Sequence, residues 1–343
     1  MAATIYTVTT ITELVNQLAS LGPSSPTTDI LINVEPDNNE NLLDFNNEDF
    51  YYHTGNFLTF GNIGGESTIT IDFKDSTLTN IYVYPNSSFF YQNFQSASTI
   101  RTTIIKNGTF EMVLNNGYVA TMLASEYSNA SNCRPKFYNC VFNLKVNGSS
   151  SYNTLFLINA NLAEFVNCVF NIDMINGSNN SIIRTKPGGA DDTGTVNLHI
   201  NSCEFRIKLG DKTSLKSLVN FNKSSPVCYN INDNIVFFDY YFPYTSGDAK
   251  ATIKHIESNY GWALNASSSY SNNFFASLDT GKEIAIKLNQ ADAKLVNGTT
   301  FFCDSEKIEG AAFPGTTCVS LSTAQCKDAA ALAAAGYVCA VEG

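Results

Sequence analysis

The chain has 343 residues, of which 44% are hydrophobic and 15% are charged, and its formal net charge is −11 at pH 7. An acidic surface without a basic run repels nucleic acid, so no nucleic-acid partner is expected. The sequence has no run of 18 apolar residues, which argues against a membrane span, and no basic and apolar leader, so no secretory signal is expected. The length suffices for one long core with a small appendage.

The first predicted element is a helix that begins after Thr10. The segment Thr10-Ile11-Thr12-Glu13 has the form of a capping box. Four apolar residues then share one helical face, and Gly22-Pro23 ends the helix; the four are Leu14, Val15, Leu18 and Leu21. Ile30–Val34 is predicted as the first strand. Because open sheet edges need a cover, residues 1–28 are predicted to form an N-terminal cap.

A six-residue signature then recurs along the chain: apolar, free, polar, small, free, large apolar. Its last residue falls at positions 78, 110, 142, 170, 205 and 236, so the copies are 28 to 35 residues apart. The copies are Phe73–Leu78, Ile105–Phe110, Phe137–Phe142, Phe165–Phe170, Ile200–Phe205 and Ile231–Val236. A period near 30 with a fixed signature is typical of a solenoid.

The residues that follow each signature alternate between apolar and polar, which predicts strands with one buried face. Met112 and Leu114 would point inward, for example, whereas Arg206 and Lys208 would point outward. The polar and small residues of the signature would occupy a bend in the chain, since Asn, Asp and Ser tolerate turn conformations. Together these patterns predict an all-β parallel β-helix over residues 29–285. An antiparallel sandwich with evenly spaced hairpins is the alternative.

Equivalent residues of successive coils should stack in columns. The predicted polar column at the bend contains Asn107, Asn139 and Asn167, and the small-residue column contains Cys140, Cys168 and Cys203. The predicted aromatic column in the interior contains Phe110, Phe142, Phe170 and Phe205. The cysteines could form a metal or redox site, or could simply be small buried residues. We favour the second interpretation because Ser76 and Gly108 occupy the same position.

The signature fades after about residue 240. Residues 245–280 are expected to be mostly irregular loops, with Ile256–Trp262 as a last, degenerate coil. Residues 286–343 are predicted to form a small C-terminal cap or attachment module. In it, the capping box Ser322-Thr323-Ala324-Gln325 leads into an Ala-rich helix that ends near Ala335, before Gly336.

The cysteines of this C-terminal module are Cys303, Cys318, Cys326 and Cys339. They lack a CxxC pair and a nearby His, so no metal site is predicted. Thiols are expected, with disulfides formed after export or lysis as the alternative.

A search for catalytic residues finds no acid cluster of recognisable spacing. The weak candidates are Asp191 and Asp192, whose Gly- and Thr-rich neighbours favour a solvated loop. His199 precedes a core residue and should point outward, and His53 and His255 have no recognisable partner. No catalytic residue, metal or cofactor is therefore predicted.

Exposed tyrosines are the candidates for ligand binding, because their rings can stack on sugars or pack at protein interfaces. The candidates lie towards the two ends of the predicted solenoid and are Tyr82, Tyr84, Tyr240, Tyr241 and Tyr244. The alternative is that they only close the ends.

The repeated signature over residues 67–240, together with the helix before the first strand, resembles the right-handed parallel β-helix superfamily of pectate-lyase-like proteins. Within it, the chain resembles the fibres, spikes and capsid-associated proteins of phages and large DNA viruses more than it resembles the enzymes. It lacks a signal peptide, an acid cluster and a basic catalytic residue with partners. The segment Leu321–Ala330, with Leu332 and Gly336-Tyr337, resembles helical tails of phage structural proteins.

The resemblance implies a non-enzymatic virion structural protein, made in the host cytoplasm and located in the virion. Its partners would be other virion proteins, further copies of itself in a homotrimer, and a glycan or protein of the host surface. A polysaccharide lyase or glycoside hydrolase is the alternative, and it would need carboxylates from different coils in one groove. A cell-surface adhesin is the second alternative.

Overall fold

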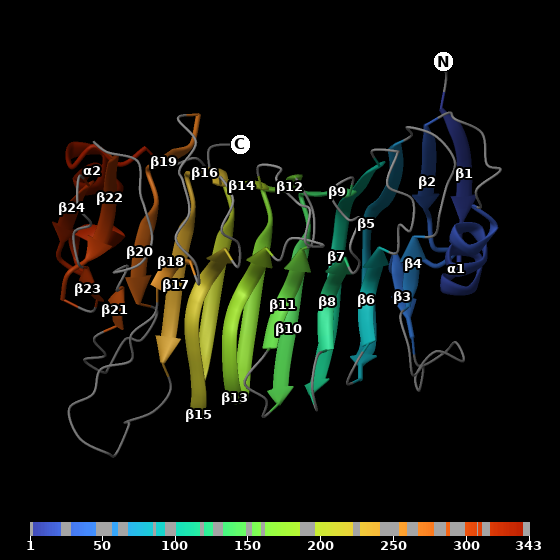
Figure 1. Ribbon diagram of the computed structural model, residues 1–343, viewed down its shortest axis with the longest axis horizontal. Coiled ribbons are helices and arrows are strands. Elements are labelled where there is room, and N and C mark those ends of the chain that lie inside the picture. Colours follow the sequence, from blue (N-terminus) through green and yellow to red (C-terminus); the bar gives the residue numbers. More distant parts are fainter. Residues whose placement is uncertain are drawn as a thin grey trace.

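The structure is a computed structural model that describes residues 3–21, 29–45, 57–60, 68–84, 87–92, 101–116, 120–125, 133–148, 153–158, 162–185, 196–221, 227–240, 254–258, 267–277, 286–288, 299–306, 308–310 and 316–338. Twenty-two of the described strands form one continuous sheet, and the described strand pairs are parallel, such as β10 with β13 and β14 with β16. The sheet winds into a parallel β-solenoid along the long axis of the molecule (Figure 1). The predicted fold is confirmed and the antiparallel sandwich is excluded.

Each coil has three faces, which we number in chain order. The first face, before the bend, contains β1 (Thr4–Val8), β2 (Ile30–Val34), β9 (Cys133–Tyr138), β12 (Leu162–Val166), β14 (Val196–Asn201), β16 (Val227–Asn232) and β19 (Ser269–Ser271). The second face, after the bend, contains β3 (Leu42–Asp44), β10 (Val141–Gly148), β17 (Ile235–Tyr240), β20 (Phe274–Ser277), β22 (Thr299–Asp304) and β24 (Thr316–Leu321).

The third face contains β4 (Leu58–Phe60), β6 (Ser87–Gln92), β8 (Ala120–Ser125), β11 (Asn153–Ile158) and β18 (Lys254–Ser258). Four long strands bend from one face into the next: β5 (Thr68–Val83), β7 (Arg101–Asn116), β13 (Val169–Thr185) and β15 (Glu204–Phe221). A separate pair joins β21 (Ile286–Leu288) to β23 (Ile308–Gly310). The strands β18, β19 and β20 lie within residues 245–280, so parts of this region belong to the solenoid and a further coil follows the one at Ile256.

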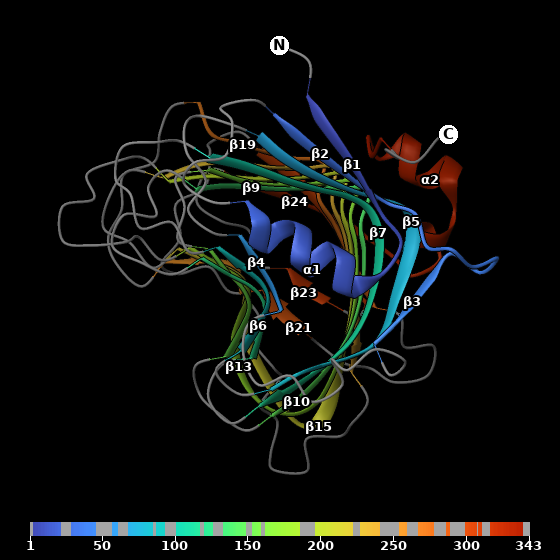
Figure 2. The same cartoon turned by 90° about the vertical axis from the view of Figure 1, so that its right-hand side faces the viewer.

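The helix α1 (Ile11–Ser20) closes the N-terminal end of the solenoid and lies across the core of the first coil (Figure 2). Thr10 Oγ1 accepts the Glu13 N–H at 3.1 Å, as the capping box predicts, and the Glu13 carboxylate accepts the Thr9 N–H at 2.7 Å. The helix buries Ile11, Leu14 and Leu18 against the core. The strand β1 precedes the helix, so Ile30–Val34 is the second strand and not the first.

The bend residue of each copy has a left-handed backbone conformation. The φ angles are 56° at Asn107, 53° at Asn139 and at Asn167, 55° at Ser202 and 59° at Asp233. Short polar side chains tolerate this conformation, which explains the polar position of the signature. A seventh copy, Tyr270–Phe275, has the same bend with a φ of 52° at Asn272. The sequence analysis missed it because it follows the sixth copy after a longer interval.

The small residue of the signature bonds across coils. Its side chain reaches the carbonyl oxygen of the first apolar residue of the preceding coil: Cys140 Sγ lies 3.5 Å from Ile105 O, and Asn234 Nδ2 donates to Ile200 O at 2.8 Å. The same contact is made by Cys168 to Phe137, Cys203 to Phe165 and Asn273 to Ile231. This position therefore selects a small donor, which gives the buried cysteines a structural role.

Gly108 is the exception in this position. A Cβ on Gly108 would lie 2.9 Å from the Phe110 ring and 3.1 Å from Phe73 Cβ, so only glycine fits. The first copy also differs, because Ile71 pairs with Ile105 and Ser76 pairs with Gly108. The segment from Ile71 to Ser76 is therefore two residues longer than the segment from Ile105 to Gly108. The predicted alignment of Phe73 with Ile105 is wrong.

The interior is filled by columns of stacked phenylalanine rings. The centroids of Phe110 and Phe142 are 5.4 Å apart, those of Phe142 and Phe170 are 5.1 Å apart, and those of Phe170 and Phe205 are 4.5 Å apart. All four side chains are buried. This packing makes the solenoid a filled rod and not a tube.

The C-terminal helix is shorter than predicted. The capping box is formed, since Ser322 Oγ accepts the Gln325 N–H at 3.2 Å and Gln325 Oε1 accepts the Ser322 N–H at 2.8 Å. A 3₁₀ turn follows at Gln325–Lys327, and α2 (Ala329–Ala334) begins only after Asp328, which caps the N–H of Ala330 at 2.9 Å. Gly336 has a φ of 91°, as expected of a residue that follows a helix.

Candidate functional site

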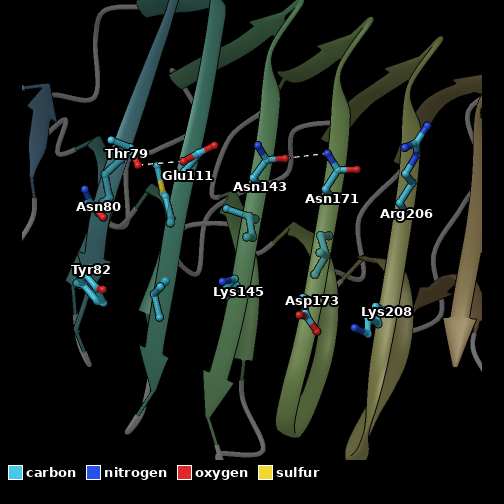
Figure 3. A pocket seen from close by; sticks show the side chains of 15 residues that line it. Thr79, Asn80, Tyr82, Glu111, Asn143, Lys145, Asn171, Asp173, Arg206 and Lys208 are labelled. Carbon is cyan, nitrogen blue, oxygen red and sulfur yellow. Dashed lines mark hydrogen bonds between the residues drawn. The ribbon is translucent and has the colours of Figure 1, made fainter. Parts of the chain in front are cut away.

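A groove of about 590 Å³ crosses the outer side of the second face, over β5, β7, β10, β13 and β15 (Figure 3). It runs across the strands, along the solenoid axis. Its floor and walls are Thr79, Asn80, Ile81, Tyr82, Glu111, Met112, Val113, Asn143, Leu144, Lys145, Asn171, Ile172, Asp173, Arg206 and Lys208. The groove is the candidate functional site because it combines polar side chains from five successive coils.

Strand alternation places these side chains in two rows. In β10, Phe142, Leu144 and Val146 are buried, so Asn143 and Lys145 point to the solvent. Parallel pairing then aligns Asn143 with Glu111 and with Asn171, and Lys145 with Val113 and with Asp173. The outward positions that the sequence predicts are therefore confirmed for these strands.

The first row contains Thr79, Glu111, Asn143, Asn171 and Arg206. Its members bond in pairs: Thr79 Oγ1 donates to Glu111 Oε2 at 2.9 Å, and Asn171 Nδ2 donates to Asn143 Oδ1 at 2.7 Å (Figure 3). Arg206 Nε donates to Glu204, its neighbour on β15. The Thr79–Glu111 and Asn171–Asn143 bonds join adjacent coils, whereas the Arg206 bond stays within its own strand.

The second row contains Tyr82, Val113, Lys145, Asp173 and Lys208. Tyr82 is half-buried at the β5 end, and Lys208 is exposed at the β15 end beside Arg206. The groove thus has an aromatic end and a cationic end, in a chain whose net charge is −11. Amides and carboxylates between these ends can bond to hydroxyl groups.

Two carboxylates line the groove, Glu111 on β7 and Asp173 on β13. They are two coils and two residues apart, which places their Cα atoms roughly 12 Å apart from strand spacings. Glu111 accepts a hydrogen bond from Thr79, on the β5 side of the groove and away from Asp173.

A second polar cluster lies on the first face, where β9, β12, β14 and β16 are neighbours. Glu164 accepts from Lys136 Nζ at 2.8 Å and from Tyr138 OH at 2.6 Å. Its other oxygen lies 3.2 Å from His199 Nδ1, and His199 Nε2 lies 3.0 Å from Asn230 Nδ2. Partial burial raises the pKa of Glu164, but the bonds from Lys136 and Tyr138 outweigh it and the pKa lies below its usual value.

The sequence analysis did not predict this cluster. A signal was available, because Lys136, Glu164, His199 and Asn230 each directly precede the first apolar residue of a copy. Stacking that position across the copies would have placed all four in one row. The sequence analysis considered His199 by itself, as a residue that should point outward.

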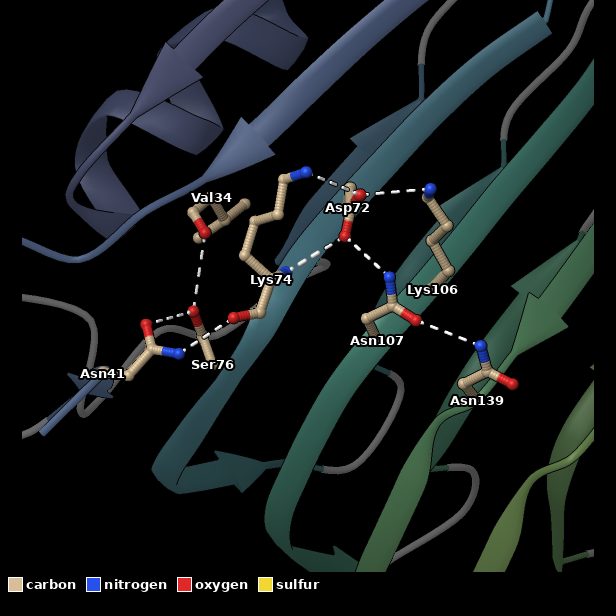
Figure 4. Close-up of polar contacts among 8 residues, drawn as sticks. All are labelled: Val34, Asn41, Asp72, Lys74, Ser76, Lys106, Asn107 and Asn139. Carbon is tan, nitrogen blue, oxygen red and sulfur yellow. Dashed lines mark hydrogen bonds and ion pairs between the residues drawn. The ribbon is translucent and has the colours of Figure 1, made fainter. Parts of the chain in front are cut away.

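Asp72 anchors a third polar network, at the N-terminal end of the predicted Asn column (Figure 4). Its carboxylate lies 3.0 Å from Lys106 Nζ and 3.2 Å from Lys74 Nζ, and it accepts from Asn107 Nδ2 at 2.9 Å. Asn107 in turn accepts from Asn139 Nδ2 at 3.1 Å. Asn167 is exposed at the next bend.

The other predicted site residues are placed as follows. Tyr82 lines the groove, and Tyr84 is half-buried at the end of β5. Tyr240 belongs to β17, whereas Tyr241, Tyr244, Asp191 and Asp192 lie outside the described residues. Cys140, Cys168 and Cys203 are buried thiols. Across the described ranges, no three His, Cys, Asp or Glu side chains are arranged to hold a metal ion.

The fold and the groove define a parallel β-solenoid with a polar, axial groove on one outer face. Comparisons with protein-family models, with curated proteins and with solved structures gave no match for this chain. Within the part of the chain that the structure describes, no helix is both long enough and apolar enough to cross a membrane.

Proposed function

We propose that this chain is a non-enzymatic attachment component of a virion, a fibre, spike or capsid-surface protein, and that its second-face groove binds a host-surface glycan. The observation that carries the proposal is the groove itself, with its two rows of outward side chains from five coils. A linear glycan laid along the solenoid axis would meet equivalent positions on each coil in turn.

The chemistry of the groove suits such a ligand. Asn143 and Asn171 each combine donors with an acceptor, as sugar hydroxyls require. Tyr82 offers a ring face against which a sugar can pack. Lys145 and Lys208 provide positive charge for an acidic sugar in an otherwise acidic protein.

The virion assignment rests on the rod-like fold and on the resemblance to pectate-lyase-like β-helices of phages and large DNA viruses. A filled solenoid is stiff along its axis, which suits a fibre or a spike. We further propose that the chain acts as a homotrimer. Light scattering on a sizing column tests this, and a monomer at micromolar concentration would contradict it.

The binding test uses the full chain on a panel of immobilised neutral and acidic glycans. We expect Tyr82→Ala and Lys145→Ala to weaken binding about tenfold, a loss of about 1.4 kcal/mol. Lys216→Ala is the matched control, because Lys216 is exposed outside the groove. If the groove variants bound the glycan as tightly as the wild type does, the groove would not be the binding site.

The same panel separates binding from catalysis. We expect the length distribution of each bound glycan to stay constant over a day of incubation. Shortened products would instead support the lyase or hydrolase alternative and would refute the non-enzymatic assignment.

A further inference from the structure

A one-way chain of hydrogen bonds crosses the first face from β19 to β12. Ser269 Oγ donates to Asn230 Oδ1 at 2.9 Å, and Asn230 Nδ2 lies 3.0 Å from His199 Nε2. His199 Nδ1 lies 3.2 Å from Glu164 Oε1. An amide nitrogen can only donate and a carboxylate can only accept. The His199 ring that satisfies both contacts is therefore neutral, with its proton on Nδ1.

Protonation of His199 conflicts with this arrangement. It adds a hydrogen to Nε2, which then faces Asn230 Nδ2, so that two donors are 3.0 Å apart. Rotation of the Asn230 amide by half a turn removes the conflict, because Oδ1 then faces the ring. Its Nδ2 would then face Ser269 Oγ, which already accepts from Asn232 Nδ2 at 2.9 Å. The hydroxyl proton of Ser269 loses its acceptor and must turn elsewhere.

We propose that His199 is a pH-operated switch that sets the direction of the hydrogen bonds from β14 to β19. Neutral His199 holds the Asn230 amide in one orientation, and protonated His199 holds it in the opposite one. The side chain of His199 is 25% exposed, so protons reach it from solvent. The switch stands independently of the glycan-binding groove, which is on another face.

The charged groups around His199 lie on one side of the ring. Glu164 on β12 contacts Nδ1 in both states, and Lys136 and Tyr138 on β9 bond to the other oxygen of that carboxylate. Towards β16 and β19 the described neighbours, Asn230 and Ser269, are uncharged. Glu164 favours the protonated ring, whereas the present orientation of Asn230 disfavours it. The two states are therefore separated by one amide rotation.

The test is NMR on the full chain with isotope-labelled His and Asn, titrated from pH 8 to pH 5. We expect His199 to carry its proton on Nδ1 at pH 8. We expect the side-chain amide signals of Asn230 to shift with the same midpoint as the His199 ring. His255 is the internal control, because it is fully buried and its pKa is lowered to about 3 by burial.

Two variants separate the switch from a simple charge effect. Asn230→Asp places only acceptors against Nε2, so it should favour the protonated ring and raise the midpoint of the His199 signals. Asn232→Asp places the same charge two residues along β16 and should raise it less. Equal shifts in both variants, or a His199 titration that leaves the Asn230 amide signals unchanged, would overturn the proposal. A proton on Nε2 at pH 8 would also overturn it.

Discussion

The rings of Phe170 and Phe205 stack with centroids 4.5 Å apart and an interplanar angle of 5°, although the two residues are 35 positions apart in the sequence. Both belong to the last position of the repeated signature, on β13 and β15, which pair in parallel register. The stack therefore exists because the solenoid brings equivalent positions of successive coils together.

Phe205→Ala should lower the free energy of unfolding by about 3 to 5 kcal/mol, since it leaves a cavity in a closely packed column. Chemical denaturation monitored by circular dichroism measures this change. Phe205→Leu is the matched control and should cost less, because it keeps most of the buried volume. A loss below about 1 kcal/mol for the Ala variant would show that the column can collapse around the gap.

Asn234→Ala should destabilise the chain by about 2 to 4 kcal/mol, because it leaves buried polar groups without partners. The side chain bonds to Ile200 O at 2.8 Å and to Cys203 N at 3.0 Å, and both atoms belong to the preceding coil. Thermal unfolding compares this variant with Asn201→Ala, on the outer side of the same sheet. Similar melting temperatures for the two variants would contradict a role for the cross-coil bond.

Asp72→Asn should remove a stabilisation that the wild type has at neutral pH and loses between about pH 4 and pH 2. Burial raises the pKa of the carboxyl, but the bonds from Asn107, from the Lys74 N–H and from both lysines outweigh it and set the pKa at about 2. Because the folded pKa lies below the unfolded value, the stabilisation is complete above about pH 4 and is lost as the pH falls to about 2. It amounts to about 2 kcal/mol.

This pH dependence can be checked by measuring the denaturation midpoints of the wild type and of Asp72→Asn at several pH values between 7 and 2. The two curves should converge at the acid end. Parallel curves across the whole range would show that Asp72 is not the group responsible.

His255 should make the chain lose stability at a higher pH than Asp72 does. Burial lowers the pKa of the imidazole to about 3, and Tyr270 OH lies 2.7 Å from Nδ1. The folded pKa lies below the unfolded value of about 6.5, so the unfolded chain binds the proton first and stability falls as the pH falls from about 6.5 to 3. The loss can reach roughly 4 kcal/mol.

His255→Gln cannot take up this proton, so its stability should fall less than that of the wild type between pH 6.5 and pH 4.5, where Asp72 remains ionised. Equilibrium unfolding at fixed pH measures both proteins. An equally steep decline in the variant would assign the acid sensitivity to other groups.

The local repeats of the sequence predicted the solenoid, the inward and outward positions, the left-handed bends and the helix after Thr10. These features depend on alternation and on the backbone preferences of single residues, so neighbours along the chain suffice to specify them. The sequence was also enough to predict Phe110, Phe142, Phe170 and Phe205 as core residues.

Only the tertiary structure decided which side chains meet across coils. Glu164 bonds to His199 and Asn171 bonds to Asn143 because parallel register aligns strands that are 28 to 35 residues apart. Insertions change that register, as the two extra residues after Ile71 show. A one-residue shift would send each side chain to the opposite face of its strand. The groove and the His199 chain depend on this alignment of whole coils, which no single segment specifies.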